Sequence, residues 1–190
     1  MPTALELVAE EARSCTKCGL AAGRTQVVFG RGDPDADLLF IGEGPGAEED
    51  RLGEPFVGRS GQLLDRLIGE ELGRSRDDVR VVNVVMCRPP GNRDPLPEEI
   101  EACSPYLARQ IELTAPRVIV TLGNFATRYV LDTKEGITKL RGRTHPHPSG
   151  AVVVPTYHPA AVLRGGAEQM AQMRADLVRA KLLLAAVAPS

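Results

Sequence analysis

The positions of four cysteines constrain the fold of this 190-residue chain more than any other feature. Cys15 and Cys18 form a C-x-x-C pair whose two sulfurs can face one point in space, and Cys87 and Cys103 lie far downstream. A four-thiolate metal site requires the second pair to fold back onto the first, which closes a long loop of chain. We therefore predict a metal centre that joins the N-terminus to the middle of one domain spanning residues 1–190. Two disulfides or four buried thiols are the alternatives.

Composition indicates an intracellular, cytoplasmic protein. Residues 1–14 contain acidic side chains and no apolar stretch typical of a signal peptide. The apolar runs are too short to cross a bilayer, so we expect no membrane partner. In a reducing compartment, four cysteines suggest metal ligands before disulfides. The net charge of −2 excludes a globally basic nucleic-acid binder but not a local basic patch, and we expect a monomer.

Short apolar segments alternate with amphipathic ones along the chain. We predict strands at 37–42, 80–85, 117–122 and 151–155, and helices at 60–72, 97–113, 123–131 and 167–186. Continuous apolar strands separated by helices indicate a parallel sheet covered on both faces. The predicted fold is therefore α/β, a three-layer αβα domain with a central, mostly parallel four-stranded sheet.

The unusual residues fall at the ends of these strands, where a parallel sheet places its ligand. The first strand runs into GEGPG at 42–46, and the second contains Asn83 and runs into a proline-rich loop at 87–95. The third ends at Gly123, and the fourth is followed by His158. Glycines, amides, a carboxylate and a histidine thus converge on one rim of the predicted sheet.

Each candidate also has a structural explanation. Burying the amide of Asn83 costs about 1–3 kcal/mol unless it is paired, so it either bonds backbone or reads the edge of a ligand. Phe56, in a glycine-rich loop, is either a core plug or a face for stacking. His158 is structural or functional, and His145 and His147 indicate a surface loop rather than a metal pair. The glycines at 42–46 do not match G-x-G-x-x-G, which argues against nucleotide phosphate binding.

Four strings of the chain together resemble the uracil-DNA glycosylase superfamily, and most closely its iron–sulfur-containing family 4. The strings are GEGPG at 42–46, PFVG at 55–58, NVVMCRPPGNRDP at 83–95 and YHPAAVLR at 157–164, in the family's order. The resemblance implies a DNA repair enzyme that flips uracil out of DNA, hydrolyses its N-glycosidic bond and releases uracil, leaving an abasic site. It also implies a structural [4Fe-4S] cluster held by Cys15, Cys18, Cys87 and Cys103.

The resemblance implies roles for individual side chains. Phe56 stacks on the flipped uracil, Asn83 pairs with its N3–H and O4, and His158 donates to O2 as negative charge develops there. Backbone N–H groups of the glycine-rich turn, which includes the substrate-binding residues Gly42 and Gly44, assist His158 in stabilising that charge. The DNA-contacting segment comprises Val162, Leu163 and Arg164, with Val162 or Leu163 wedged into the vacated stack.

Family 1 of this superfamily carries an Asp that orients water where Gly44 stands and a Tyr that excludes thymine where Gly46 stands. We therefore predict that Glu43 activates water with Asn92 as its partner, and that Glu48 meets the C5 position of the base. Two other functions fit parts of the sequence. A uracil-recognising module that does not cleave DNA needs Asn83 and Phe56 but not His158, and an electron carrier needs only the cluster.

Overall fold

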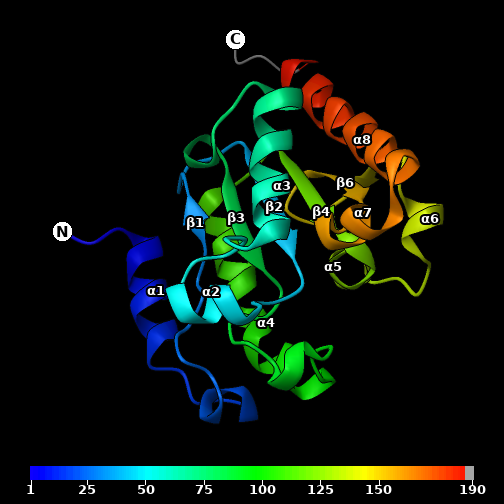
Figure 1. The fold of residues 1–190 in the computed structure, drawn as a ribbon. Coiled ribbons are helices and arrows are strands. Elements are labelled where there is room, and N and C mark those ends of the chain that lie inside the picture. The colour runs from blue at the N-terminus through cyan, green and yellow to red at the C-terminus, as the bar shows by residue number, and fades with distance from the viewer. Residues whose placement is uncertain (187–190) are drawn as a thin grey trace.

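A six-stranded sheet with helices on both faces organises the computed structural model, which describes residues 1–186 (Figure 1). The strand order is β1-β3-β2-β4-β6-β5. The four inner strands are parallel, and a two-residue strand pairs antiparallel with each edge. The bounds are β1 (Arg31–Gly32), β2 (Leu38–Gly42), β3 (Arg80–Asn83), β4 (Val118–Leu122), β5 (His145–Pro146) and β6 (Val152–Thr156).

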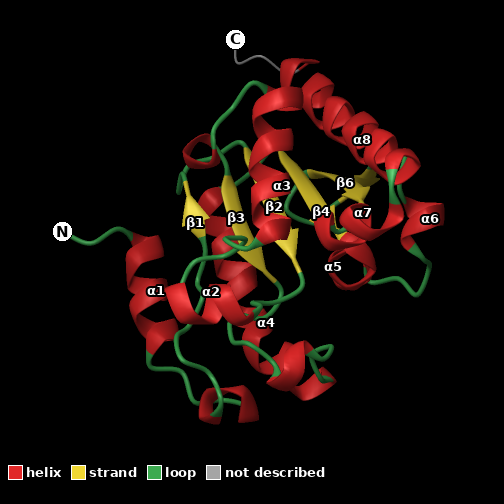
Figure 2. Cartoon of the chain, viewed as in Figure 1, coloured by secondary structure: helices red, strands yellow, loops and turns green. Residues whose placement is uncertain are grey.

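Helices form the two outer layers of the domain (Figure 2). Across residues 1–186, none of them combines the length and the apolar character needed to cross a membrane. Short 3₁₀ turns occupy Gly19–Ala22, Arg76–Asp78 and Pro90–Asn92. The α-helices are α1 (Ala4–Arg13), α2 (Ala47–Leu52), α3 (Arg59–Leu67), α4 (Pro97–Thr114), α5 (Gly123–Leu131), α6 (Ile137–Leu140), α7 (Pro159–Gly165) and α8 (Ala167–Ala186).

Side chains of the inner strands point alternately to the two faces of the sheet, which explains the three layers. Leu38 and Phe40 of β2 belong to a core shared with α3, α7 and α8. Leu39 and Ile41 belong to a second core, shared with α4 and α5 on the other face. Because successive side chains of a strand point to opposite faces, both faces of these apolar strands must be covered by helices.

The predicted αβα architecture is confirmed, whereas the predicted number of four strands is wrong. The two missed strands, β1 and β5, are too short to give a readable apolar pattern. All four predicted helices are present, although the one predicted at 60–72 is α-helical only to Leu67 and continues as a π-helical segment, Ile68–Leu72. Helices α1, α2, α6 and α7 were not predicted.

The strand register determines which chain segments meet at the rim. Gly42 at the end of β2 pairs with Asn83 at the end of β3, and Leu122 of β4 pairs with Thr156 of β6. The residues that follow these pairs are therefore neighbours in space. A Cβ on Gly123, which has φ +91°, would lie 2.9 Å from the Cβ of His158.

A buried ion pair fixes the end of β6 to α8. Asp176 is fully buried and accepts hydrogen bonds from Thr156 Oγ1 at 2.9 Å and from Arg141 Nε and Nη2 at 2.9 and 3.0 Å. The Arg141 guanidinium also lies 5.5 Å from the ring centroid of Tyr157. These contacts fix the backbone immediately before His158.

Candidate functional site

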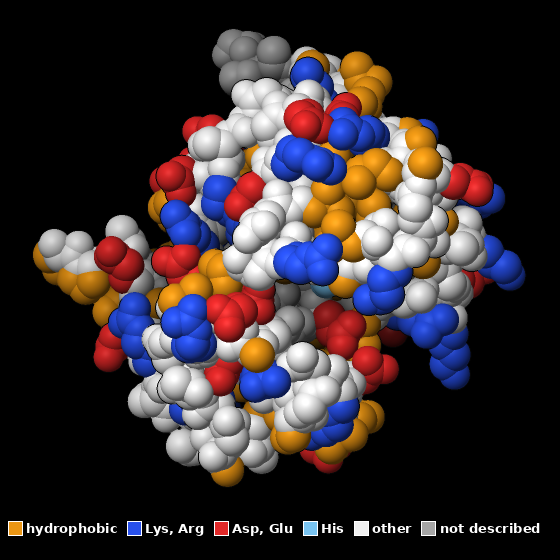
Figure 3. Space-filling model, in the orientation of Figure 1, with side chains coloured by type: hydrophobic (Ala, Val, Ile, Leu, Met, Phe, Trp, Pro, Cys, Tyr) orange, Lys and Arg blue, Asp and Glu red, His pale blue; other side chains and the backbone are white. Residues whose placement is uncertain are grey.

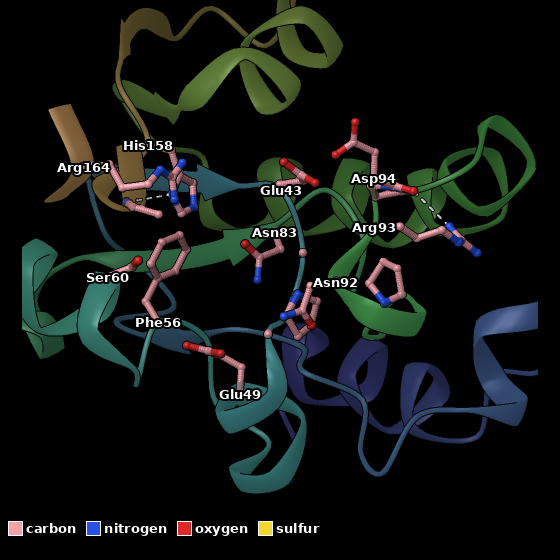
Figure 4. A pocket seen from close by; sticks show the side chains of 16 residues that line it. Glu43, Glu49, Phe56, Ser60, Asn83, Asn92, Arg93, Asp94, His158 and Arg164 are labelled. Atoms are coloured by element: carbon pink, nitrogen blue, oxygen red, sulfur yellow. Dashed lines mark hydrogen bonds between the residues drawn. The ribbon is translucent and has the colours of Figure 1, made fainter. Parts of the chain in front are cut away.

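A cavity of about 490 Å³ opens beyond the carboxyl ends of β2, β3 and β6 (Figure 4). Its volume lies within the range of about 300–1,000 Å³ that is typical of small-ligand sites. The cavity brings together residues predicted from four separate strings of the sequence. Those that line it are Glu43, Gly44, Phe56, Asn83, Asn92, His158 and Arg164.

Phe56 and Asn83 approach each other over Gly42. A Cβ on Gly42 would lie 2.5 Å from Asn83 Oδ1 and 2.6 Å from Phe56 Cζ, so any side chain there would displace one of them. The Phe56 and His158 ring centroids are 5.7 Å apart, with an angle of 32° between the planes. Gly42 therefore lies behind the cavity wall, where its missing side chain leaves room for Phe56 and Asn83.

The backbone of Phe56 adopts a left-handed conformation, with φ 54°, which is uncommon for a bulky residue. Arg76 restrains this turn, because its Nη1 donates to the carbonyl of Pro55 at 3.1 Å and its Nη2 to that of Phe56 at 2.8 Å. Asp65 in turn accepts from Arg76 Nε. The sequence offers no signal for Arg76, because its partners are carbonyl groups about twenty residues away.

Asn83 is 2% exposed, and its Oδ1 has no hydrogen-bond partner within the described part of the chain. An unpaired buried acceptor costs about 1–3 kcal/mol, so it calls for a donor that the protein does not supply. Figure 4 shows the amide between Phe56 and the 87–95 loop, facing the cavity. The geometry therefore favours a ligand-reading amide over one that bonds backbone.

His158 precedes α7 and has a fixed orientation. Its Nδ1 accepts a hydrogen bond from the backbone N–H of Ala160 at 3.1 Å. Burial lowers the pKa of His158 to about 4; the positive charge of Arg164 adds to this effect and Glu49 opposes it. The imidazole is therefore neutral near pH 7, and because Nδ1 is an acceptor, the proton resides on Nε2.

Glu43 is one of the carboxyl groups that line the cavity. Burial raises its pKa to about 7, and the neighbouring carboxyl of Asp94 adds to the effect. Arg93 does not neutralise this pair, because its guanidinium forms two hydrogen bonds with the buried carboxylate of Glu99, at 2.9 and 2.6 Å. Asp94 was not among the predicted residues, although it lies in the predicted rim loop.

Asn92 belongs to the 87–95 loop and lines the same cavity from that side (Figure 4). Its Oδ1 accepts from Arg88 Nε at 2.7 Å, and its backbone has φ 55°. Its amide NH₂ group is therefore the part available to a ligand or water. The carboxyl group that acts on Glu43 is that of Asp94.

Glu49, and not the predicted Glu48, faces the cavity. Glu48 is exposed and pairs with Arg51 at 2.8 Å. Glu49 Oε1 accepts from the backbone N–H groups of Val57 and Gly58, at 3.0 and 3.1 Å, which ties α2 to the loop carrying Phe56. Adjacent helical residues point in directions about 100° apart, so only one member of the acidic run can face the site.

The predicted DNA-contacting segment lies in helix α7. Val162 is 2% exposed and packs in the core with α3 and α8, so its predicted contact with DNA is wrong. Leu163 is 45% exposed, and Arg164 is also exposed, at the edge of the cavity. The side chain that remains available as a wedge is Leu163.

The four cysteines are free and line one small cavity between α1, the end of β3 and α4. Arg24 Nη1 lies 3.6 Å from Cys87 Sγ, and the backbone N–H of Met86 donates to Cys103 Sγ at 3.4 Å. Burial raises the pKa of Cys103 to about 12, so a cation must displace the proton to make this thiol a ligand. Within residues 1–186, no three or more His, Cys, Asp or Glu side chains converge as ligands of one metal ion.

Known proteins resemble this chain over most of its length. The model of the Uracil DNA glycosylase superfamily matches residues 29–180. A type-4 uracil-DNA glycosylase of Saccharolobus solfataricus is 50% identical over 166 residues, which cover 84% of this chain and 77% of the relative. A type-4 uracil-DNA glycosylase of Thermotoga maritima is 46% identical over 179 residues, 93% of each chain. A type-5 uracil-DNA glycosylase of Thermus thermophilus is 35% identical over 150 residues, 69% of this chain and 68% of the relative.

We predict that Asp94→Asn lowers the pKa of Glu43 below about 7, because it removes a negative charge that opposes ionisation. Burial is the larger cause, so the pKa should stay above the ordinary value of 4.5. A carboxyl ¹³C NMR titration measures it. Asp35→Asn, in an exposed turn, is the matched control, and an identical Glu43 titration in both variants would contradict the assignment.

Proposed function

Since this chain belongs to the type-4 uracil-DNA glycosylases of the uracil-DNA glycosylase superfamily, we propose that its cavity receives a uracil flipped out of DNA. The chain is a DNA repair glycosylase, which hydrolyses the N-glycosidic bond of uracil in DNA. The observation that supports the placement of the base is the unpaired Oδ1 of Asn83, buried beside Phe56.

The base is recognised by one amide and one ring. Asn83 Oδ1 accepts from the N3–H of uracil, and Nδ2 donates to O4, whereas cytosine presents the opposite pattern at both positions. Phe56 stacks on the ring and excludes water from it. Flipping costs a few kcal/mol, which these contacts offset. Glu49, held by the backbone of residues 57 and 58, borders the base where a methyl group would enter.

Bond cleavage leaves negative charge on the departing uracil. His158 presents Nε2–H to O2 of the base, and its neutral form is already set by burial and by the Ala160 hydrogen bond. A fixed donor of this kind stabilises developing charge by about 3–4 kcal/mol, because it needs no reorganisation during the reaction.

Water attack on the sugar requires a base, and Glu43 fits this role. With a pKa of about 7, its carboxylate is available above that pH and is lost by protonation as the pH falls. Asn92 can orient the same water through its amide NH₂ group, because Arg88 occupies its oxygen.

The four thiols fit a [4Fe-4S] cluster as the structural metal centre. All four line one cavity, as the four thiolate ligands of such a cluster must. Cys15, Cys18, Cys87 and Cys103 would hold the group, and N–H donors from Arg24 and Met86 would stabilise the negative sulfurs. When bound, the cluster would supply a covalent crosslink between the N-terminal segment, the loop after β3 and α4.

Asn83→Asp should let the enzyme excise cytosine, because a protonated carboxyl presents the reversed hydrogen-bond pattern. We expect uracil excision to fall about 10- to 100-fold, as one buried pair becomes mismatched. Oligonucleotides with one uracil or one cytosine are incubated and then heated in alkali, which breaks abasic sites. Unbroken uracil strands with the wild-type protein would refute the enzymatic reading, and unchanged base choice in the variant would refute the pocket.

His158→Ala should lower the single-turnover rate about 10²–10³-fold, because it removes a donor used in the transition state. DNA affinity should change little. His147→Ala is the matched control, since His147 lies in the loop before β6 and outside the cavity. Equal losses of rate and affinity in His158→Ala would make it a binding residue instead.

Protein purified without oxygen should be brown and contain iron and acid-labile sulfide. Cys18→Ala should reduce both and expose the N-terminal segment to proteolysis, because the crosslink to α4 is lost. Ser14→Ala, in the same segment, should retain both the metal and the resistance to proteolysis. A colourless folded protein containing only zinc would contradict the cluster.

A further inference from the structure

A shallow groove runs between α3 and α7 beside the base cavity. Arg59, Gln62, Leu63, Arg66 and Leu163 line it. Arg59 and Arg66 are seven residues apart on α3 and therefore lie on one face of the helix, two turns apart. The groove adjoins the cavity, because Ser60 and Arg164, the chain neighbours of Arg59 and Leu163, line the cavity wall.

The arginines at this rim are unusual in lacking carboxylate partners. Of the nineteen arginines, only Arg59, Arg143 and Arg164 make neither a hydrogen bond nor an ion pair within residues 1–186. Two of these three flank the exposed Leu163. Arg66 has only a 3.8 Å contact with Glu70, and both side chains are about half exposed, so water screens this pair.

The charge of the cavity and that of the groove differ. Three carboxyl groups line the cavity, those of Glu43, Glu49 and Asp94. Among the described residues 1–186, no acidic side chain lines the groove, although the chain carries a net charge of −2. A neutral base can enter the cavity, but a phosphate there would be repelled. Figure 3 shows basic side chains bordering the apolar surface over α3 and α7.

We propose that the groove between α3 and α7 binds the sugar–phosphate backbone of DNA next to the flipped nucleotide, with Arg59 and Arg66 contacting phosphates. This inference rests on the proposed function, because it takes DNA as the substrate. The phosphates remain at the arginine-lined rim while the neutral base enters the acidic cavity.

The salt dependence of binding tests the groove. Each lost phosphate contact reduces the slope of log Kd against log salt concentration by about 0.7 for single-stranded and 0.9 for double-stranded DNA. We expect this change in Arg59→Ala and in Arg66→Ala, and about twice as much in the double variant. Arg59→Lys should keep the wild-type slope. The probe is a fluorescent oligonucleotide with one 2′-fluorinated deoxyuridine, which resists cleavage, and anisotropy measures Kd over a salt series.

Arg13→Ala is the control, because it removes one exposed positive charge from α1. Within residues 1–186, the ion pair of Arg13 is with Glu10 of the same helix. The slope of Arg13→Ala should equal that of the wild type. A slope in Arg59→Ala and Arg66→Ala equal to that of Arg13→Ala overturns the groove, even where alkali cleavage shows that uracil is excised. Absence of excision by the wild type would instead refute the proposed function, and reduced slopes would still support the groove as a DNA surface.

Discussion

The close approach of Phe56 and Asn83 over Gly42 is the contact on which the site depends. It follows from the pairing of β2 with β3, which places Gly42 directly beside Asn83. The missing side chain at Gly42 lets an aromatic ring and an amide lie close together above the strand end. Arg76 then fixes the unusual backbone of Phe56, so the ring is in position before a ligand arrives. A preformed slot of this kind loses little entropy when a planar base enters it.

Burial shifts the pKa values of two cavity residues, His158 and Glu43, in opposite directions. It lowers the pKa of His158 to about 4 and raises that of Glu43 to about 7, because in each case the charged form is the one that loses hydration. Near neutral pH the site therefore has an uncharged donor and a carboxyl poised to accept a proton. In the proposed mechanism, the same desolvation would strengthen the interaction of the His158 N–H with the charge that develops on the leaving base.

The rule that parallel strands place ligands at their carboxyl ends predicts the convergence of Asn83 and His158, because each ends or follows a readable strand. Phe56 lies between α2 and α3, and only the family resemblance predicted its place at the site. The errors among the predicted site residues come from helices that are too short to give a readable sequence pattern. The six-residue helix α2 decides that Glu49 rather than Glu48 faces the cavity, and α7 turns Val162 into the core. Pro159 in the first turn of α7 was a usable signal for that helix. Arg76 had none, because long-range carbonyl contacts leave no local pattern.

The cysteine cavity and the base cavity are linked through one short segment. Asn83 ends β3, and four residues later Cys87 lines the thiol cavity, while the backbone N–H of Met86 donates to Cys103 on α4. Val84 and Val85 donate to the carbonyls of Gly42 and Glu43, so the same segment also holds the glycine turn. The proposed crosslink at Cys87 and Cys103 would therefore restrain both walls of the proposed base pocket without contacting the substrate. This restraint is the physical role that we propose for a metal centre in a hydrolase that moves no electrons.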